Sequence, residues 1–354
     1  MTIDIAGPQQ VTAPGPHGTS TETLAVAALD GTPLNLHHVT SSWPVTKGPV
    51  ILVHGAGVRA DIFRPPGQVT LVDLLLQHGW DVWLENWRAS IDLEPTPWTL
   101  DQAAAFDHPA LVQRVCEETG ADSVKAVIHC QGSTSFAMST VAGLLPQVET
   151  IVANAVTLHP VVPAAARAKL LYLTPVVARI TDHISPRWGL DNPTRFAAAL
   201  SAAVRATHHE CDHIVCRMVS FTYGVGFPCL WSHANLTPEV HDWIEGEFAD
   251  VSLNFFAQMG RSVRVGHLVS DLPGLPSSYV AAPPRTDARF ALFAGADNRC
   301  FLPQSQQRTY DFLDGHAPGR HSLTIVPGYG HLDIFFGARA DRDVFPLMIE
   351  ELST

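Results

Sequence analysis

One segment constrains the fold of this chain more than any other: residues 124–138, VKAVIHCQGSTSFAM. Its apolar, β-branched first half is typical of a buried strand, and the small residues that follow Cys130 are typical of a helix. A sharp turn between the two would place Cys130 at the helix N-terminus. There the helix dipole lowers the pKa of a thiol, and nearby amides can bind an oxyanion. Cys130 is therefore the candidate nucleophile, although a buried structural cysteine fits the same residues.

Two later segments also combine a strand with a turn, and they carry the other groups of a catalytic triad. Residues 289–298, RFALFAGADN, predict a strand that ends in a turn at Asp297, the candidate acid. Residues 322–336, SLTIVPGYGHLDIFF, predict a strand, a Gly-rich turn and a helix opened by His331, the candidate base. Taken singly, such an aspartate is most often a turn former and such a histidine is most often solvated. Their order along the chain after the nucleophile favours a triad.

A fourth segment supplies amides for an oxyanion. Residues 49–57, PVILVHGAG, predict a buried strand and a Gly-rich turn at His54. Glycines let the backbone turn tightly and expose an N–H, so the amides of Ala56 and Gln131 are the expected oxyanion hole. The turn lacks the Lys-Ser/Thr of a phosphate-binding loop and the spacing of a dinucleotide fingerprint. We therefore expect neither nucleotide binding nor another cofactor.

These segments resemble the acid-lipase branch of the α/β-hydrolases, and more closely the bacterial lipase-like modules fused to cholesterol-oxidase-type flavoenzymes. The resemblance covers most of the chain, from about residue 50 to the C-terminus. It rests on VILVHGAG, HGWDVWLENWRAS (78–90), IHCQGS, LWSHANLTPEVHDW (230–243) and YGHLDIFFG (329–337).

The cysteine turn also resembles that of polyhydroxyalkanoate synthases, whose pattern is G-x-C-x-G and whose GxDVWL…WR strand precedes a TLDD-like stretch, here residues 98–101. This chain keeps Gly132 but has Ile128 at the first small position. The HG turn and the GHLD turn are lipase-like, whereas the cysteine is synthase-like. Both resemblances imply the same triad: Cys130 as nucleophile, Asp297 as orienting acid and His331 as base.

Alternating strand and helix patterns predict an α/β fold with a mostly parallel central sheet and helices on both faces. Strands at 22–28, 33–39 and 50–53 predict an opening β-meander. After about residue 160 the pattern becomes helical, and Pro283-Pro284 marks its end. This predicts a helical cap inserted late in the chain. The expected segments are a disordered leader (1–20), a hydrolase core (21–160 and 286–354) and a cap (161–285).

Composition narrows the partners and the compartment. The net charge is -12 without a basic run, so neither nucleic acid nor an anionic membrane surface is expected as a partner. No apolar stretch reaches the roughly 18–20 residues of a membrane helix, so integral membrane association is not expected. The N-terminus lacks the basic and apolar regions of a secretion signal, and the six cysteines then predict free thiols in the cytoplasm. The oligomeric state stays open, with a homodimer as one option.

The expected cap contains metal-binding residue types at 208–213, HHECDH, with Cys216 and Cys229 nearby. His213 and Cys216 have an H-x-x-C spacing. A structural zinc site needs four ligands in tetrahedral geometry, and the C-x-x-C pair of a zinc knuckle is absent. We therefore expect polar packing within the cap in preference to a metal site.

The cap is also rich in aromatic residues, most of which would be ordinary core. Above a catalytic cysteine they could form an apolar acyl pocket. The residues expected to contact substrate are His54, Phe221, Tyr223, Phe227, Trp231 and Phe255.

These groups predict an acyl hydrolase, an esterase, lipase or thioesterase, that cleaves a hydrophobic ester or thioester through a covalent acyl-cysteine. An acyltransferase that passes the acyl group to an alcohol or amine is the alternative. A third hypothesis is an inactive hydrolase fold used for binding. A cysteine that replaces an original serine would fit the same residues.

Overall fold

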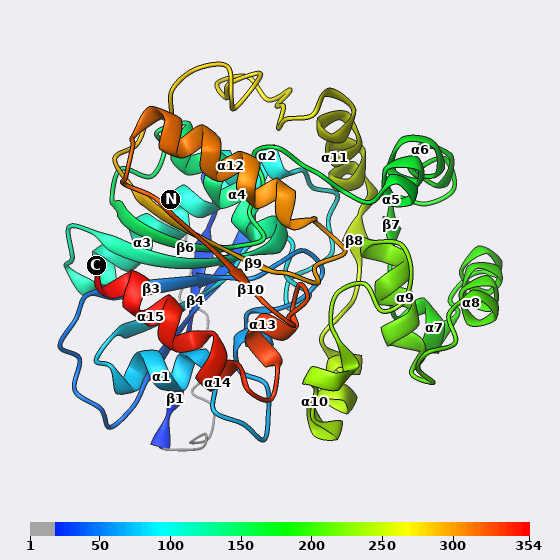
Figure 1. Cartoon of the computed structure of the whole chain (residues 1–354), viewed down its shortest axis with the longest axis horizontal. Coiled ribbons are helices and arrows are strands. Elements are labelled where there is room, and N and C mark those ends of the chain that lie inside the picture. The colour runs from blue at the N-terminus through cyan, green and yellow to red at the C-terminus, as the bar shows by residue number, and fades with distance from the viewer. Residues whose placement is uncertain (1–17) are drawn as a thin grey trace, which may run out of the picture.

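One eight-stranded sheet forms the centre of the molecule (Figure 1). The computed structural model describes residues 18–354. The strands stand in the order β1-β2-β4-β3-β5-β6-β9-β10, and β2 alone runs antiparallel to both of its neighbours. The strands are β1 (Ser20–Ala27), β2 (Pro33–Thr40), β3 (Pro49–Val53), β4 (Asp81–Asn86), β5 (Val124–His129), β6 (Val148–Asn154), β9 (Arg289–Gly295) and β10 (Ser322–Val326).

The opening strands do not form the expected meander. β1 and β2 pair antiparallel, but β4 lies between β2 and β3, and β3 pairs in parallel with both β4 and β5. Every residue of β3 is buried, which suits a strand covered on both faces. Parallel neighbours need a crossover connection, and α1 (Leu71–Gln77) lies in the connection between β3 and β4.

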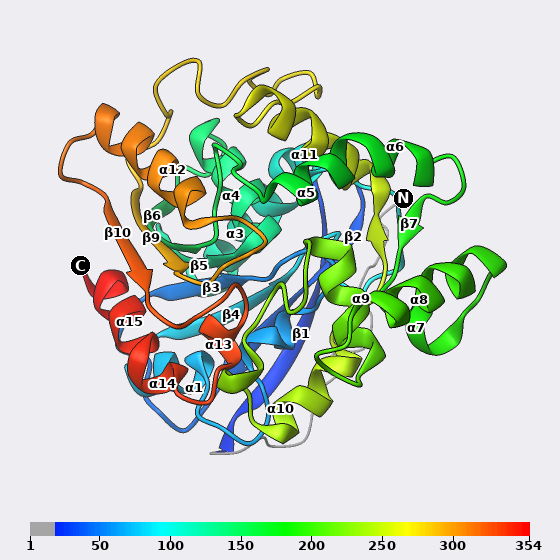
Figure 2. The same ribbon diagram turned by 45° about the vertical axis from the view of Figure 1, so that its right-hand side comes forward.

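Helices cover both faces of the sheet, which confirms the expected α/β-hydrolase architecture (Figures 1 and 2). Helices α1 and α15 lie on one face, and α3, α4 and α12 lie on the other. All residues of α4 are buried, because this helix packs between the sheet and its neighbours. Besides α1, this part of the chain has η2 (Ala60–Phe63), α2 (Leu100–Gln102), η3 (Ala103–Asp107), α3 (His108–Thr119), α4 (Cys130–Val141), α12 (Pro303–His316), α13 (Asp333–Phe336), α14 (Ala340–Asp343) and α15 (Phe345–Ser353).

Between β6 and β9 the chain leaves the sheet and is mainly helical, beside the carboxyl ends of the strands (Figure 1). Its return to the core is marked by the amide of Arg285, which donates to the carbonyl of Val141. The limits of the cap, 161–285, stay a prediction. The elements are α5 (Ala164–Ala168), η4 (Lys169–Leu173), α6 (Thr174–Val177), β7 (His183–Ile184), α7 (Trp188–Asp191), α8 (Arg195–Thr207), α9 (Ile214–Tyr223), η5 (His233–Asn235), α10 (Pro238–Trp243), η6 (Ile244–Gly246), β8 (Val251–Ser252) and α11 (Leu253–Val265).

The sequence predicts a disordered leader at residues 1–20 and no membrane-spanning helix. Residues 1–17 of the expected leader lie outside the described residues, and β1 begins at Ser20. Across residues 18–354, each helix is too short or too polar to cross a membrane.

Candidate active site

Cys130 stands where strand β5 turns directly into helix α4. Its φ is 55°, in the left-handed region that a residue with a Cβ rarely adopts. Strain of this kind persists only where the surrounding structure holds it, and it is typical of functional turns. The turn places the thiol at the N-terminus of α4, where the sequence pattern predicts it.

Two glycines allow this turn to lie against the loop that follows β3. A Cβ at Gly132 would overlap the carbonyl oxygen of His54, and a Cβ at Gly55 would lie 3.0 Å from the Cβ of Cys130. Residues without a side chain therefore make the close approach possible. Ile128, which stands where the family pattern has a small residue, is fully buried in β5.

The backbone amides of Ala56 and Gln131 lie next to the sulfur of Cys130. Burial raises the pKa of Cys130 to about 12, and these two amides oppose the rise. Two backbone donors that converge beside a nucleophile are the arrangement that a developing oxyanion needs. Tyr223 of α9 supports this loop, because its hydroxyl donates to the carbonyl of Ala56 at 2.8 Å.

His331 lies in the turn between β10 and α13, with a ring nitrogen within 4.8 Å of the sulfur of Cys130. Its Nδ1 is 3.1 Å from Nδ2 of Asn298, and its Nε2 is buried without a hydrogen-bond partner among the described residues. Burial lowers the pKa of His331 to about 3. The thiol and the imidazole are therefore both neutral at neutral pH.

Asn298 occupies the place beside His331 that the sequence analysis assigned to Asp297. Asp297 is exposed, and its amide donates to the carbonyl of Tyr329. Across residues 18–354, no hydrogen bond joins its carboxylate to His331. Asn298 is 2% exposed and follows one residue later in the same turn. A turn has no fixed residue period, so the sequence pattern could not distinguish the two neighbouring side chains.

The hydrogen bonds of Asn298 define the proton position on His331. Its Oδ1 accepts from the amides of Cys300 and Phe301, at 3.0 and 3.2 Å. Backbone amides only donate, so Nδ2 of Asn298 faces His331 and donates to Nδ1. The neutral ring then carries its proton on Nε2. In this arrangement Nε2 of His331 is a donor toward Cys130, not an acceptor.

Cys130 opens onto a small cavity of about 30 Å³ beneath the helices of the inserted segment. A second cavity of about 120 Å³ adjoins it and is almost entirely apolar. Both are lined by Lys169, Leu170, Thr222 and Phe256. The expected substrate-contacting residues Tyr223 and Phe255 line the first cavity, and Phe221 lines the second.

Three other residues expected to contact substrate lie away from these two cavities. Phe227 packs against His233. Trp231 packs against Phe248 and Phe336. His54 is fully buried, with Nδ1 at 2.6 Å from the carbonyl of Gly55 and its ring stacked on Trp87.

Lys169 is a cavity residue that the sequence analysis did not select. Its ammonium donates to the carbonyls of Phe221 and Gly224 at the end of α9, and it lies over the ring of Phe221. Burial lowers the pKa of Lys169 to about 8. A lone lysine in an Ala- and Leu-rich stretch has no sequence pattern that would mark it as a cavity residue.

Comparison with known proteins agrees with the observed fold. A family model described as the alpha/beta hydrolase fold matches residues 48–171. The chain has the α/β-hydrolase fold. A thermophilic esterase from Thermogutta terrifontis superposes with a TM-score of 0.54 at 14% identity, covering 94% of this chain and 98% of the esterase. A monoacylglycerol lipase from Paleococcus ferrophilus gives a TM-score of 0.52 at 14% identity, covering 94% of this chain and 99% of the lipase.

Among curated proteins, this chain is distantly similar to lipases and sterol esterases. Sterol esterase 2 of Saccharomyces cerevisiae is 27% identical over 170 residues, and lipase lipl-5 of Caenorhabditis elegans is 32% identical over 130 residues. These matches cover 41% and 31% of this chain but only 32% of each relative. Triacylglycerol lipase 1 of Arabidopsis thaliana is 22% identical over 355 positions, covering 92% of this chain and 85% of the lipase.

Proposed function

We propose that this protein is a lipase- or esterase-like acyl hydrolase in which Cys130 is the nucleophile. The observation that carries the proposal is the conformation of Cys130. It has a strained φ at a strand-to-helix turn, and two backbone amides converge on its sulfur. A cysteine that only fills space needs neither feature.

The reaction begins when Nε2 of His331 accepts the proton of the Cys130 thiol. The thiolate attacks the ester carbonyl, and the amides of Ala56 and Gln131 stabilise the tetrahedral oxyanion. The alcohol leaves with the proton from His331, which yields an acyl-cysteine. Water, deprotonated by His331, then attacks the thioester, and its collapse releases the acid and returns the proton to the sulfur.

Asn298, in preference to Asp297, takes the orienting position in this scheme. The resting hydrogen bonds place the proton of His331 on Nε2, whereas the first step needs a lone pair there. The proton must therefore move to Nδ1, and Asn298 must turn its amide oxygen toward it. The described arrangement is thus a resting state of the site.

The cavities favour a hydrophobic acyl substrate that enters after the inserted segment has moved. A volume of about 30 Å³ at Cys130 holds a water molecule or two but no acyl chain. The adjoining apolar cavity shares Phe256 with the cavity at Cys130, and it is the space that we assign to a chain attached to the cysteine. The similarity to proteins named sterol esterase and triacylglycerol lipase supports a lipid ester as the substrate class.

Intact-mass analysis after incubation with activated esters and acyl thioesters of increasing chain length tests this function. We expect an acyl adduct on Cys130, faster formation with longer chains, and no adduct in Cys130→Ala. Hydrolysis of these substrates by Cys130→Ala at the wild-type rate would refute the proposal.

Acyl transfer is the second candidate, and the cysteine itself favours it, because a thioester reacts readily with amines. Product partition from a pre-formed acyl-enzyme distinguishes the two functions. If alcohols and amines do not accelerate deacylation and acid is the only product, the protein is a hydrolase. If the acyl-enzyme persists in water and discharges only when an acceptor is added, it is a transferase.

A further inference from the structure

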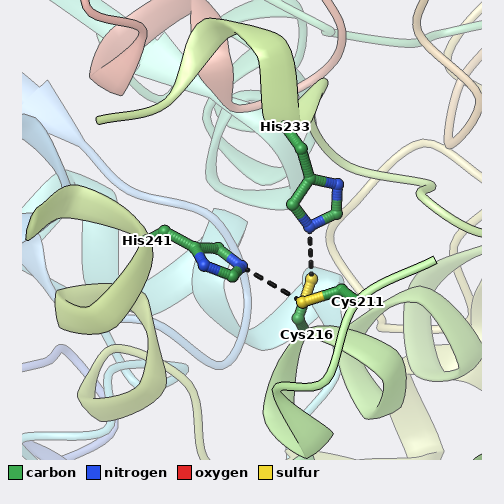
Figure 3. A group of neighbouring side chains, drawn as sticks. All are labelled: Cys211, Cys216, His233 and His241. Carbon is green, nitrogen blue, oxygen red and sulfur yellow. Dashed lines mark hydrogen bonds between the residues drawn. The ribbon is translucent and has the colours of Figure 1, made fainter. Parts of the chain in front are cut away.

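Four side chains outside the active site converge on one point in the segment between α8 and α10 (Figure 3). They are Cys211, Cys216, His233 and His241, and their ligand atoms all lie within 4.8 Å of one another. The sulfur of Cys211 is 3.4 Å from Nε2 of His241, and the sulfur of Cys216 is 3.2 Å from Nε2 of His233.

We propose that these four residues bind a structural zinc ion, with two thiolates and two imidazoles as ligands. Zinc prefers tetrahedral sets of sulfur and nitrogen ligands, with Zn–S near 2.3 Å and Zn–N near 2.0–2.1 Å. Such a tetrahedron has sulfur-to-nitrogen edges of about 3.5 Å. The observed separations of 3.4 and 3.2 Å are close to these edges, so small side-chain shifts would complete the site.

A backbone amide and a carboxylate lie beside two of the four residues, as such groups often do beside metal ligands. The amide of His213 donates to the sulfur of Cys211 at 3.4 Å, which stabilises a thiolate. A carboxylate oxygen of Glu210 lies 3.9 Å from Nδ1 of His233, the ring nitrogen on the side away from the cysteines. That Nδ1 is buried and has no hydrogen bond among the described residues. A closer approach of Glu210 would give this nitrogen a hydrogen bond, which orients a histidine ligand and raises its basicity.

The sequence predicts polar packing here, because residues 208–213 with Cys216 and Cys229 contain no C-x-x-C pair. The structure instead joins Cys216 to a histidine 17 residues later and Cys211 to one 30 residues later. His213, which has the H-x-x-C spacing, stacks on His241 with the ring centres 4.3 Å apart and lies outside the four-ligand group.

The site would fix a loop that contacts the catalytic histidine. The cysteines come from the start of α9 and the turn before it, and the histidines from η5 and α10, so a metal would clamp both ends of the connection 224–232. Within that connection, the carbonyl of Leu230 accepts from the amides of His331 and Leu332, at 3.0 and 2.8 Å. Four protein ligands leave no open position on zinc, so its role would be structural and not catalytic.

Metal analysis of the full-length protein tests the site directly. We expect one zinc ion per chain in protein purified without chelator. In Cys211→Ser and His241→Asn the zinc content should fall to roughly a tenth or less, because even residues that only support a metal ligand change affinity 10–100-fold. Cys116→Ser, on α3, is the matched control and should keep the metal.

Cobalt substitution tests the site in the wild-type protein and does not depend on the folding of a variant. Wild-type protein produced in cobalt-supplemented medium should show the intense visible bands of a tetrahedral ion and a sulfur-to-cobalt charge-transfer band, which Cys116→Ser should retain. Absence of bound metal and of these bands in folded wild-type protein would overturn the proposal. A Cys211–Cys216 disulfide, detected by mass without reductant, would also overturn it.

The zinc proposal does not depend on the proposed function. Chelation should lower the melting temperature of the wild type and should slow acylation of Cys130, whereas Cys130→Ala should bind zinc as the wild type does. The zinc measurements and the acylation measurements can therefore fail independently, so the failure of one proposal is distinguishable from the failure of the other.

Discussion

One side-chain amide, that of Asn298, determines which nitrogen of His331 carries the proton. In Asn298→Asp one carboxylate oxygen can accept from Nδ1–H while the other keeps the two backbone amides. We expect a raised pKa of His331, a free lone pair on Nε2, and acylation of Cys130 at neutral pH that is about tenfold faster, since one pKa unit corresponds to a factor of ten. Burst kinetics with an activated ester measure this rate.

The neighbouring carboxylate provides the control for that experiment. Asp297→Asn should change the acylation rate by less than about twofold, because its side chain is exposed and away from His331. Asn298→Ala should lower the rate. A large loss in Asp297→Asn together with no change in the Asn298 variants would show that the acid approaches His331 in the working enzyme.

The burial of Cys130 also predicts an unusual pH dependence for the rate at which its thiol is alkylated. Because burial raises the pKa of Cys130 to about 12, the thiolate fraction is small at neutral pH and grows as the pH rises. We expect the rate of alkylation by a small iodoacetamide to climb from about pH 7 to about pH 10 without a plateau. Peptide mapping assigns the product to Cys130, with Cys130→Ala as the blank. A plateau near neutral pH would instead indicate a thiolate-imidazolium pair with His331.

Among the secondary-structure elements, the close approach of α4 to the loop after β3 is the most sensitive contact of the site. Gly132→Ala introduces a methyl group against the carbonyl of His54. We expect a loss of about 1–3 kcal/mol in the free energy of unfolding, as for other overpacked sites, together with reduced acylation. Urea unfolding measures the first quantity.

Gly315→Ala is the matched substitution in another helix. It lies in α12, and a Cβ there would meet no atom within 4 Å. It should be neutral or stabilising by up to about 1 kcal/mol, because alanine favours a helix over glycine. Equal effects of the two substitutions would mean that helix propensity, not the approach to His54, determines the stability.

For the molecule as a whole, the boundary between the two cavities should determine which lengths of acyl chain the protein accepts. Phe256 of α11 lines both cavities, so Phe256→Leu should widen the passage between them. We expect the ratio of kcat/KM for long-chain to short-chain esters to rise several-fold. Phe312→Leu, which changes an aromatic residue of α12 that packs against His316, should leave the ratio unchanged. An unchanged ratio in Phe256→Leu would place the acyl chain elsewhere.

Local sequence patterns determined the secondary-structure elements and turns that carry Cys130 and His331. The strand predicted in the first half of residues 124–138 is β5, and the turn that follows carries Cys130 at the start of a helix. His331 was likewise located from the strand and glycines that precede it. These features follow from hydrophobic periodicity and from backbone conformations that few residue types adopt, both of which are local properties of the chain.

Only the tertiary structure decided which residues meet. It placed β4 between β2 and β3, so that β3, which is buried throughout, lies between two parallel neighbours. It placed Asn298 and not Asp297 beside His331, since a turn has no periodicity from which to read the direction of a side chain. It also brought Cys211 and His241 together across 30 residues. Such contacts depend on how whole elements pack, and no local pattern encodes that packing.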